Sequence, residues 1–338
     1  MLFSFIFAYP AFCAETGSAA DPNKKTTEPR YSEELKKKAE AKDAVAQFDL
    51  GRCYALGMGV EQNYAEAIEW WRKAGEQSNV DAQLALGNYY STCTRSEPNQ
   101  MEAVKWFSKA AEQGNALAQY NLGVMYANGQ GVRKNYEFAV KWYTKAAEQG
   151  YISAQYNLGS MYFNGPGVEK NYKEAFKWYK KAADEGYVSA QRSLAMMYDN
   201  GQGVTKDYRE AFNWYKKAAD EGDVLAQYNL GMRYDKGQGV AQNNQEAIYW
   251  YTKAAERGFV KAQLVLGLKY YKGEGTMANY IEAYKWLLLA TAQGDKDASG
   301  VEPIVKKKMS EEQIIHAEKL AKEFKTKVNA TLKADEIK

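Results

Sequence analysis

The motif Ala-Gln-x-x-Leu returns every 36 residues along this chain, and its register never slips. In each copy a tyrosine follows the glutamine by 7 residues and a tryptophan by 23. The glutamines are Gln47, Gln83, Gln119, Gln155, Gln191, Gln227 and Gln263, and the tryptophans are Trp70, Trp106, Trp142, Trp178, Trp214, Trp250 and Trp286. A fixed period of this length indicates an array of repeats, in which each unit buries its apolar side against its neighbours.

Each unit begins with a pattern typical of an amphipathic helix. In the unit at residues 115–150, Ala118, Leu122 and Met125 recur at the spacing of one buried helical stripe. The glycine-rich stretch that starts at Gly129 ends this first helix, because glycine accepts the left-handed backbone of a C-terminal cap.

The second half of the unit predicts another helix, which Asn135 can cap. The same position in the other units holds Asn63, Asn99, Asn171, Asp207, Asn243 and Asn279. All six have Glu three residues later, a variant of the capping box, whereas Asn135 is followed by Phe138. The inward positions of this second helix are Ala139, Trp142 and Ala146. We expect the alanines to let the paired helices approach and the tryptophan to fill the space between units.

Segments at both ends of the array can cap it. Residues 32–42 align with the end of a second helix and predict a polar N-terminal capping helix. Residues 296–338 predict a C-terminal capping helix and tail, which would cover the apolar run 287–289. Ser310 and Gln313 form a capping box that opens this helix. Its apolar face is expected to carry Ile314, Ala317, Leu320, Ala321 and Phe324.

The unit resembles the Sel1-like repeat, a relative of the tetratricopeptide repeat. The resemblance rests on AQYNLGVMYANGQGV and AVKWYTKAAEQG and covers about residues 43–295. It implies an all-α fold, a right-handed α/α solenoid of seven 36-residue helix-turn-helix repeats. It also implies adaptor and scaffold roles, which in bacteria include exported proteins of host interaction, envelope regulation and polysaccharide export. Two units depart from the pattern: Cys93 and Arg95 replace glycines of the second, and Ala195 replaces a glycine of the fifth.

The chemistry open to the chain is restricted by its single histidine among 338 residues. Only His316 could serve a Ser-His-Asp or Cys-His arrangement, and it lies on the polar C-terminal helix, away from other candidate groups. We therefore expect no catalytic residue, no metal site and no cofactor. The net charge of +3 is spread along the chain and gives no basic field for nucleic acid.

Residues 1–14 form an apolar run followed abruptly by a polar segment, and this pattern favours a signal peptide. The run is too short to span a bilayer, so no integral membrane segment is expected after cleavage. We expect residues 15–31 to form a disordered linker. We expect an exported protein, periplasmic or secreted, and a cytoplasmic one if the N-terminal segment is not a signal. No Lys or Arg precedes the apolar run, which departs from the usual signal pattern.

Two cysteines remain after such a cleavage, Cys53 and Cys93. An even number in an exported protein permits a disulfide. Their positions lie on first helices of adjacent units, with Cys93 one helical turn beyond the direct neighbour of Cys53. The bond is therefore feasible but the sequence leaves it open.

The residues that differ between copies on the first helices define a candidate binding groove, since the related tetratricopeptide fold lines its concave surface with these helices. The groove residues are Tyr120, Val124, Asn128, Tyr156, Ser160, Asn164, Arg192, Met196, Asn200, Tyr228, Met232 and Lys236, with Leu117, Ala127, Ser153, Phe163, Asp199 and Asp235 beside them. Aromatic rings, amides and a few charges suit an extended peptide or a partner helix. In the alternative reading, the tyrosines pack between repeats and the asparagines cap helix ends.

The sequence thus predicts a monomeric, non-enzymatic scaffold that binds another protein or peptide. One alternative is a hydrolase acting on β-lactams or peptidoglycan. The chain lacks a nucleophile-base pair and also lacks the cysteine pair that enzyme-like members of the family carry in nearly every repeat. The other alternative is a cytosolic regulatory adaptor.

Overall fold

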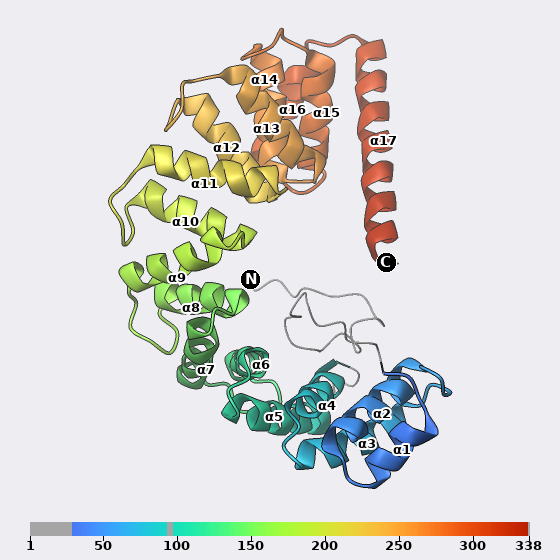
Figure 1. Ribbon diagram of the computed structural model, residues 1–338. Coiled ribbons are helices and arrows are strands. Elements are labelled where there is room, and N and C mark those ends of the chain that lie inside the picture. Colours follow the sequence, from blue (N-terminus) through green and yellow to red (C-terminus); the bar gives the residue numbers. More distant parts are fainter. Residues whose placement is uncertain (1–28, 93–96, 337–338) are drawn as a thin grey trace. The chain divides into compact units, whose positions relative to one another are not determined.

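The computed structural model describes residues 29–92 and 97–336, and within these ranges every regular element is an α-helix (Figure 1). The helices form two compact units. The first unit ends at Lys170 and the second begins at Asn171. The first unit contains α1 (Glu33–Glu40), α2 (Ala44–Leu56), α3 (Tyr64–Glu76), α4 (Val80–Thr92), α5 (Glu97–Glu112), α6 (Ala116–Asn128), α7 (Tyr136–Glu148) and α8 (Ile152–Asn164). The second contains α9 (Tyr172–Asp184), α10 (Val188–Asn200), α11 (Tyr208–Asp220), α12 (Val224–Lys236), α13 (Asn244–Glu256), α14 (Val260–Lys272), α15 (Tyr280–Thr291), α16 (Lys296–Lys306) and α17 (Glu311–Glu336).

The predicted all-α solenoid of seven 36-residue repeats is confirmed. The even-numbered helices α2 to α14 are the first helices of the repeats, and the odd-numbered helices α3 to α15 are the second helices. Most of these helices are 13 residues long, so a repeat is two short helices and two turns.

The turns form as the glycines and asparagines predict. Gly129 caps α6 in the left-handed conformation, at a φ of 75°, and the Asn135 side chain accepts a hydrogen bond from the Phe138 N–H that opens α7. In the repeats with Glu three residues after the N-cap, the reciprocal half of the expected capping box is not formed, because the N-cap N–H donates to the preceding first helix, as Asn63 N–H does to the Tyr54 carbonyl at 2.9 Å. The same bond joins the two helices in other repeats. Asn99 was expected to cap α5 but lies inside it, since α5 begins at Glu97.

Within a repeat, the two helices approach closely at a glycine. A Cβ atom on Gly123 would lie 2.7 Å from the Tyr143 ring, and one on Gly231 would lie 2.8 Å from the Tyr251 ring. In the repeats that contain Gly123 and Gly231, the residue after the tryptophan, rather than the tryptophan itself, therefore packs over the first helix of its own repeat. The residues at this position are Trp71, Phe107, Tyr143, Tyr179, Tyr215, Tyr251 and Leu287, and all of them are buried.

The tryptophans pack between repeats, as expected, but not equally. Trp106 is 2% exposed, and its ring lies against Gly75 at the end of the preceding second helix. Trp70 and Trp142 are only half-buried. Lysines lie over several of the rings, including Lys73 over Trp70 at 4.0 Å. Lysine side chains thus cover part of the accessible ring faces by cation–π contacts.

Additional helices cover both ends of the array. Ala39 of α1 packs with Ala46 and Leu50 of α2. At the other end, the Trp286 and Phe324 rings meet edge to face at 5.4 Å, which joins α17 to α15. The α17 helix opens with reciprocal bonds: Gln313 N–H donates to Ser310 Oγ and Ser310 N–H donates to Gln313 Oε1. No helix in the described ranges is long and apolar enough to cross a membrane.

Replacing Trp106 with Ala should lower the free energy of unfolding by about 3–5 kcal/mol, because it empties a fully packed site between two repeats. Trp70→Ala is the matched control and should cost clearly less, because Trp70 is half-buried. Thermal and denaturant unfolding of both variants would measure the difference. Equal losses would contradict the assignment of Trp106 to the core.

Gly131→Ala should be more destabilising than Gly150→Ala. Both glycines have positive φ, 65° and 86°, so both variants bear the left-handed strain of about 1–2 kcal/mol. Only at Gly131 would the new Cβ overlap a backbone, the carbonyl of Gln100, whereas nothing lies within 4 Å at Gly150. Denaturant unfolding of the two variants separates steric overlap from backbone strain, and equal effects would refute the close approach.

Candidate functional site

The predicted groove residues lie on one face of each first helix from α6 to α12. Their spacing of four residues places Tyr120, Val124 and Asn128 in a row along α6, and α8, α10 and α12 repeat this row. In each row the first two side chains are half-buried and the last is exposed.

The first residue of the row is used for packing between repeats. In three rows this side chain contacts the N-cap residue of the first helix in the following repeat. The contacts join Tyr120 to Tyr151 with ring centroids 5.0 Å apart, Arg192 Nε to Asp223 Oδ2 at 3.0 Å, and Tyr228 to Phe259 with ring centroids 5.0 Å apart. These side chains therefore hold successive first helices together, as the alternative reading of the sequence expects for the tyrosines.

The last residue of the row makes local bonds at the helix end. Asn164 Nδ2 donates to the Ser160 carbonyl at 3.0 Å, and Asn200 Nδ2 donates to Gln202 Oε1 at 3.3 Å. Lys236 is exposed at the same position of α12. The middle and last positions, such as Met196 with Asn200, are thus the accessible part of the row.

Two ion pairs join first helices in the second unit, one buried and one partly buried, and the sequence did not reveal them. Arg233 Nη2 of α12 lies 2.6 Å from Asp199 Oδ2 of α10. Lys269 Nζ of α14 lies 2.5 Å from Asp235 Oδ1 of α12. Asp199 is buried, although its position suggested a groove residue. Burial raises the pKa of the Asp199 carboxyl, and the Arg233 charge opposes that rise.

The signal for these pairs lies in the row of residues at the position of Arg233. That row holds Cys53, Tyr89, Met125, Met161 and Met197 before it changes to Arg233 and Lys269. A basic residue replacing a methionine at a core position requires a buried counter-charge. The aspartates that supply it precede each cation by 34 residues, one repeat less two positions.

Two further predictions concern the cysteine pair and the single histidine, whose side chains differ in their exposure to solvent. Cys53 is buried with a free thiol, 3.4 Å from the Pro29 carbonyl. Cys93 lies outside the described residues, so the bond between them stays a prediction. His316 is exposed on α17. No cluster of His, Cys, Asp or Glu with metal-binding geometry occurs in the described part of the chain.

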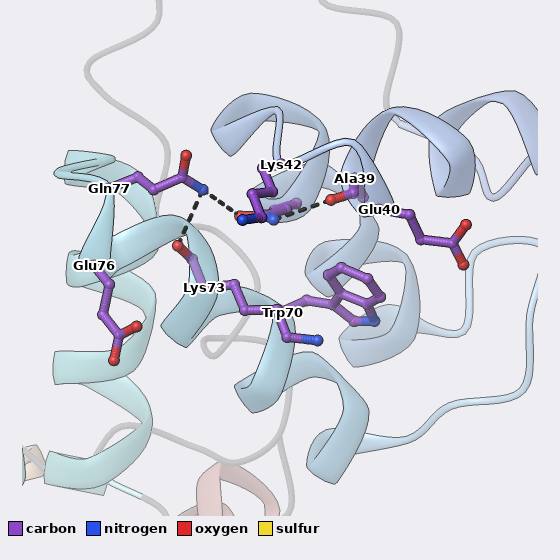
Figure 2. Close-up of a pocket in the computed structure, with 8 residues that line it drawn as sticks. Ala39, Glu40, Lys42, Trp70, Lys73, Glu76 and Gln77 are labelled. Carbon is purple, nitrogen blue, oxygen red and sulfur yellow. Dashed lines mark hydrogen bonds between the residues drawn. The ribbon is translucent and has the colours of Figure 1, made fainter.

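A pocket of about 520 Å³ lies beside the N-terminal cap, where the short α1 leaves the Trp70 ring partly uncovered (Figure 2). Its lining residues are Ala39, Glu40, Lys42, Gln47, Trp70, Lys73, Glu76 and Gln77. The amides are already engaged: Gln77 Nε2 donates to Gln47 Oε1 at 2.7 Å, and Gln47 Nε2 donates to the Ala39 carbonyl at 3.0 Å. The Glu40 and Glu76 side chains point away from each other in Figure 2. This lining supplies no nucleophile with an adjacent base.

A family model for the Sel1 repeat matches residues 44–79, 80–115, 116–151, 152–187, 188–223, 224–259 and 260–295. The chain belongs to the Sel1 repeat family. Proteins of this family typically act as protein-interaction scaffolds, and they bind protein partners. No curated protein matches the chain.

Solved structures of Sel1 repeat proteins share this fold. A Sel1 repeat protein from Oxalobacter formigenes is 33% identical, covers 79% of this chain and 89% of its own, and has a TM-score of 0.53. The protein c5321, a protective antigen present in uropathogenic Escherichia coli strains, is 30% identical. The match covers 86% of this chain and 78% of c5321, with a TM-score of 0.41. Helicobacter pylori cysteine rich protein B is 29% identical over 38% of this chain and 92% of its own, with a TM-score of 0.31.

Arg233→Met should lower the free energy of unfolding by about 3–5 kcal/mol, because it leaves Asp199 buried without its counter-charge. The double variant Asp199→Ala/Arg233→Met restores the Ala and Met that other repeats carry there, and it should recover most of the loss. Denaturant unfolding would measure both. A double variant as unstable as the single one would contradict the pairing.

The loss of unfolding free energy caused by Arg233→Met should become smaller as the pH falls. Burial raises the folded-state pKa of Asp199 above its unfolded-state value. Stability is therefore lost as the pH rises through the range between these two pKa values. Below both pKa values the Asp199 carboxyl is neutral and needs no counter-charge. Unfolding measured across mildly acidic pH, with the double variant as reference, would show the two stabilities converging at low pH.

Proposed function

We propose that this protein is a non-enzymatic scaffold that binds a protein or peptide partner on the face of its first helices. One observation carries the proposal. The recurring side chains of the repeat are used in packing and capping, whereas the middle position of the first-helix row varies between Val, Ser and Met and is partly exposed, and the last position is exposed. Variable side chains on a rigid repeat framework are what partner recognition requires.

The accessible positions proposed for contact are Val124, Asn128, Ser160, Asn164, Met196, Asn200, Met232 and Lys236. Tyr120, Tyr156, Arg192 and Tyr228, which complete the predicted groove, border this surface and support it. Within each unit, these apolar and polar side chains can accommodate an extended peptide or a helix.

The proposed contact can be tested by affinity capture with the double variant Val124→Glu/Met232→Glu. The control variant, Lys141→Glu/Asn213→Glu, places two glutamates on exposed positions of second helices. Partners captured by the wild-type protein should be lost with the first variant and kept with the control, at unchanged thermal stability. Equal recovery with both variants would remove the first-helix face as the binding site.

Export is the second part of the proposal, and it rests on the apolar run at residues 1–14. Cell fractionation and N-terminal sequencing of the mature protein should find the chain outside the cytoplasm and shortened near Ala14. An intact N-terminus in the cytosolic fraction would instead favour the cytosolic adaptor. Turnover of a chromogenic β-lactam, abolished by a single substitution, would favour the hydrolase.

A further inference from the structure

Charge is distributed unevenly over the first helices of the two units. The four first helices of the N-terminal unit, α2, α4, α6 and α8, carry one basic and two acidic residues. The three of the C-terminal unit, α10, α12 and α14, carry six basic and two acidic residues. The six are Arg192, Arg233, Lys236, Lys261, Lys269 and Lys272. The C-terminal unit therefore presents an excess of positive charge on these helices.

Three of the six cations are engaged inside the repeat stack. Arg192 pairs with Asp223, Arg233 pairs with Asp199, and Lys269 pairs with Asp235. Lys236, Lys261 and Lys272 are exposed. Among the ion pairs of the described residues, only Lys272 has a partner, Glu274 at 3.5 Å, and both of these side chains are about half exposed. Such a surface pair contributes little and opens readily.

These lysines border a row of apolar side chains. The middle positions of α10, α12 and α14 are Met196, Met232 and Leu268, all half-buried, and Leu225 on α12 is 41% exposed. The matching positions of the N-terminal unit are Arg52, Asn88, Val124 and Ser160. The two ion pairs between α10, α12 and α14 fix these three helices side by side. An apolar row with basic ends is thus particular to the C-terminal unit.

Helix stabilisation does not account for all three lysines. Lys236 and Lys272 lie in the last turns of their helices, where a cation is favourable to the helix dipole. Lys261 lies in the first turn of α14, where the same dipole disfavours a cation. An exposed lysine at that end is better explained by attraction of a negatively charged group from outside.

We propose that the first-helix face of the C-terminal unit, formed by α10, α12 and α14, binds an amphipathic peptide segment that carries acidic residues beside its apolar side. Met196, Met232 and Leu268 receive the apolar side chains, since flexible methionines adapt to partner helices. Lys236, Lys261 and Lys272 attract the carboxylates. This inference rests on the proposed function and specifies its partner. A nucleic acid fits less well, because an apolar row separates the few free lysines.

Selection from a library of short random peptides displayed on phage, with the full chain as target, tests the proposal. The selected peptides should have a net negative charge and apolar residues at helical spacing. Their affinity, measured by fluorescence anisotropy, should fall by roughly tenfold or more for Met232→Glu/Lys236→Glu. It should also weaken as the salt concentration rises.

The matched control is Tyr249→Glu/Lys253→Glu, which makes the same change of charge at two exposed positions, four residues apart, on the second helix α13. It should bind the selected peptides like the wild type, and both variants should keep the wild-type melting temperature. Acidic peptides whose binding is lost with Val124→Glu/Asn128→Glu on α6 but kept with Met232→Glu/Lys236→Glu would overturn this inference and leave the proposed scaffold function standing.

Selected peptides that are neutral or basic would also overturn the inference alone. Failure to select any peptide would count against both the inference and the scaffold function. Binding to duplex DNA or to phosphatidylserine vesicles, lost on Lys236→Glu/Lys272→Glu while no acidic peptide binds, would replace the peptide by one of those ligands.

Discussion

The repeat depends on a buried amide that ties one helix pair to the preceding helix. The glutamine of the repeated motif donates its Nε2–H to a carbonyl at the end of that helix, as Gln83 does to Gly75 at 2.9 Å and Gln263 does to Ala255 at 3.2 Å. In several repeats a second glutamine, 30 residues later, donates to the first one, as Gln113 does to Gln83. An unpaired amide in this core would be costly, so the bond fixes the angle at which each pair joins the next.

The amide network changes in the C-terminal unit. Where the later glutamine is replaced by Glu221, Gln191 Nε2 turns to that carboxylate at 3.4 Å. Where it is replaced by Arg257, the guanidinium donates to the Gly222 carbonyl instead. Within the described residues, the Oε1 atoms of Gln191 and Gln227 are buried without a hydrogen-bond partner. The C-terminal unit thus lacks some of the hydrogen bonds between glutamine side chains and has ion pairs between its first helices.

Most of the fold follows from local rules that the sequence displays. The glycines fix the ends of the first helices, and the side chains of Asn135 and its counterparts fix the starts of the second helices. The 36-residue period identifies which residues face inward. Contacts between repeats are harder to predict, because partners such as Asp199 and Arg233 occupy different positions of the repeat. The role of Tyr120 was open for the same reason, since its partner Tyr151 belongs to the next repeat.

The ion pairs also bear on how nearly identical repeats find their proper neighbours. Apolar contacts such as those of Met125 or Met161 are alike in several repeats and discriminate poorly between correct and shifted pairings. If Asp199 faced one of those methionines, its carboxylate would be buried without a counter-charge, which is far more costly than a missing apolar contact. The paired charges therefore penalise misalignment of α10, α12 and α14 specifically. The same charges hold those three helices in a fixed order beneath the row of Met196, Met232 and Leu268, so the ordering of the stack and the shape of the accessible face have one physical origin.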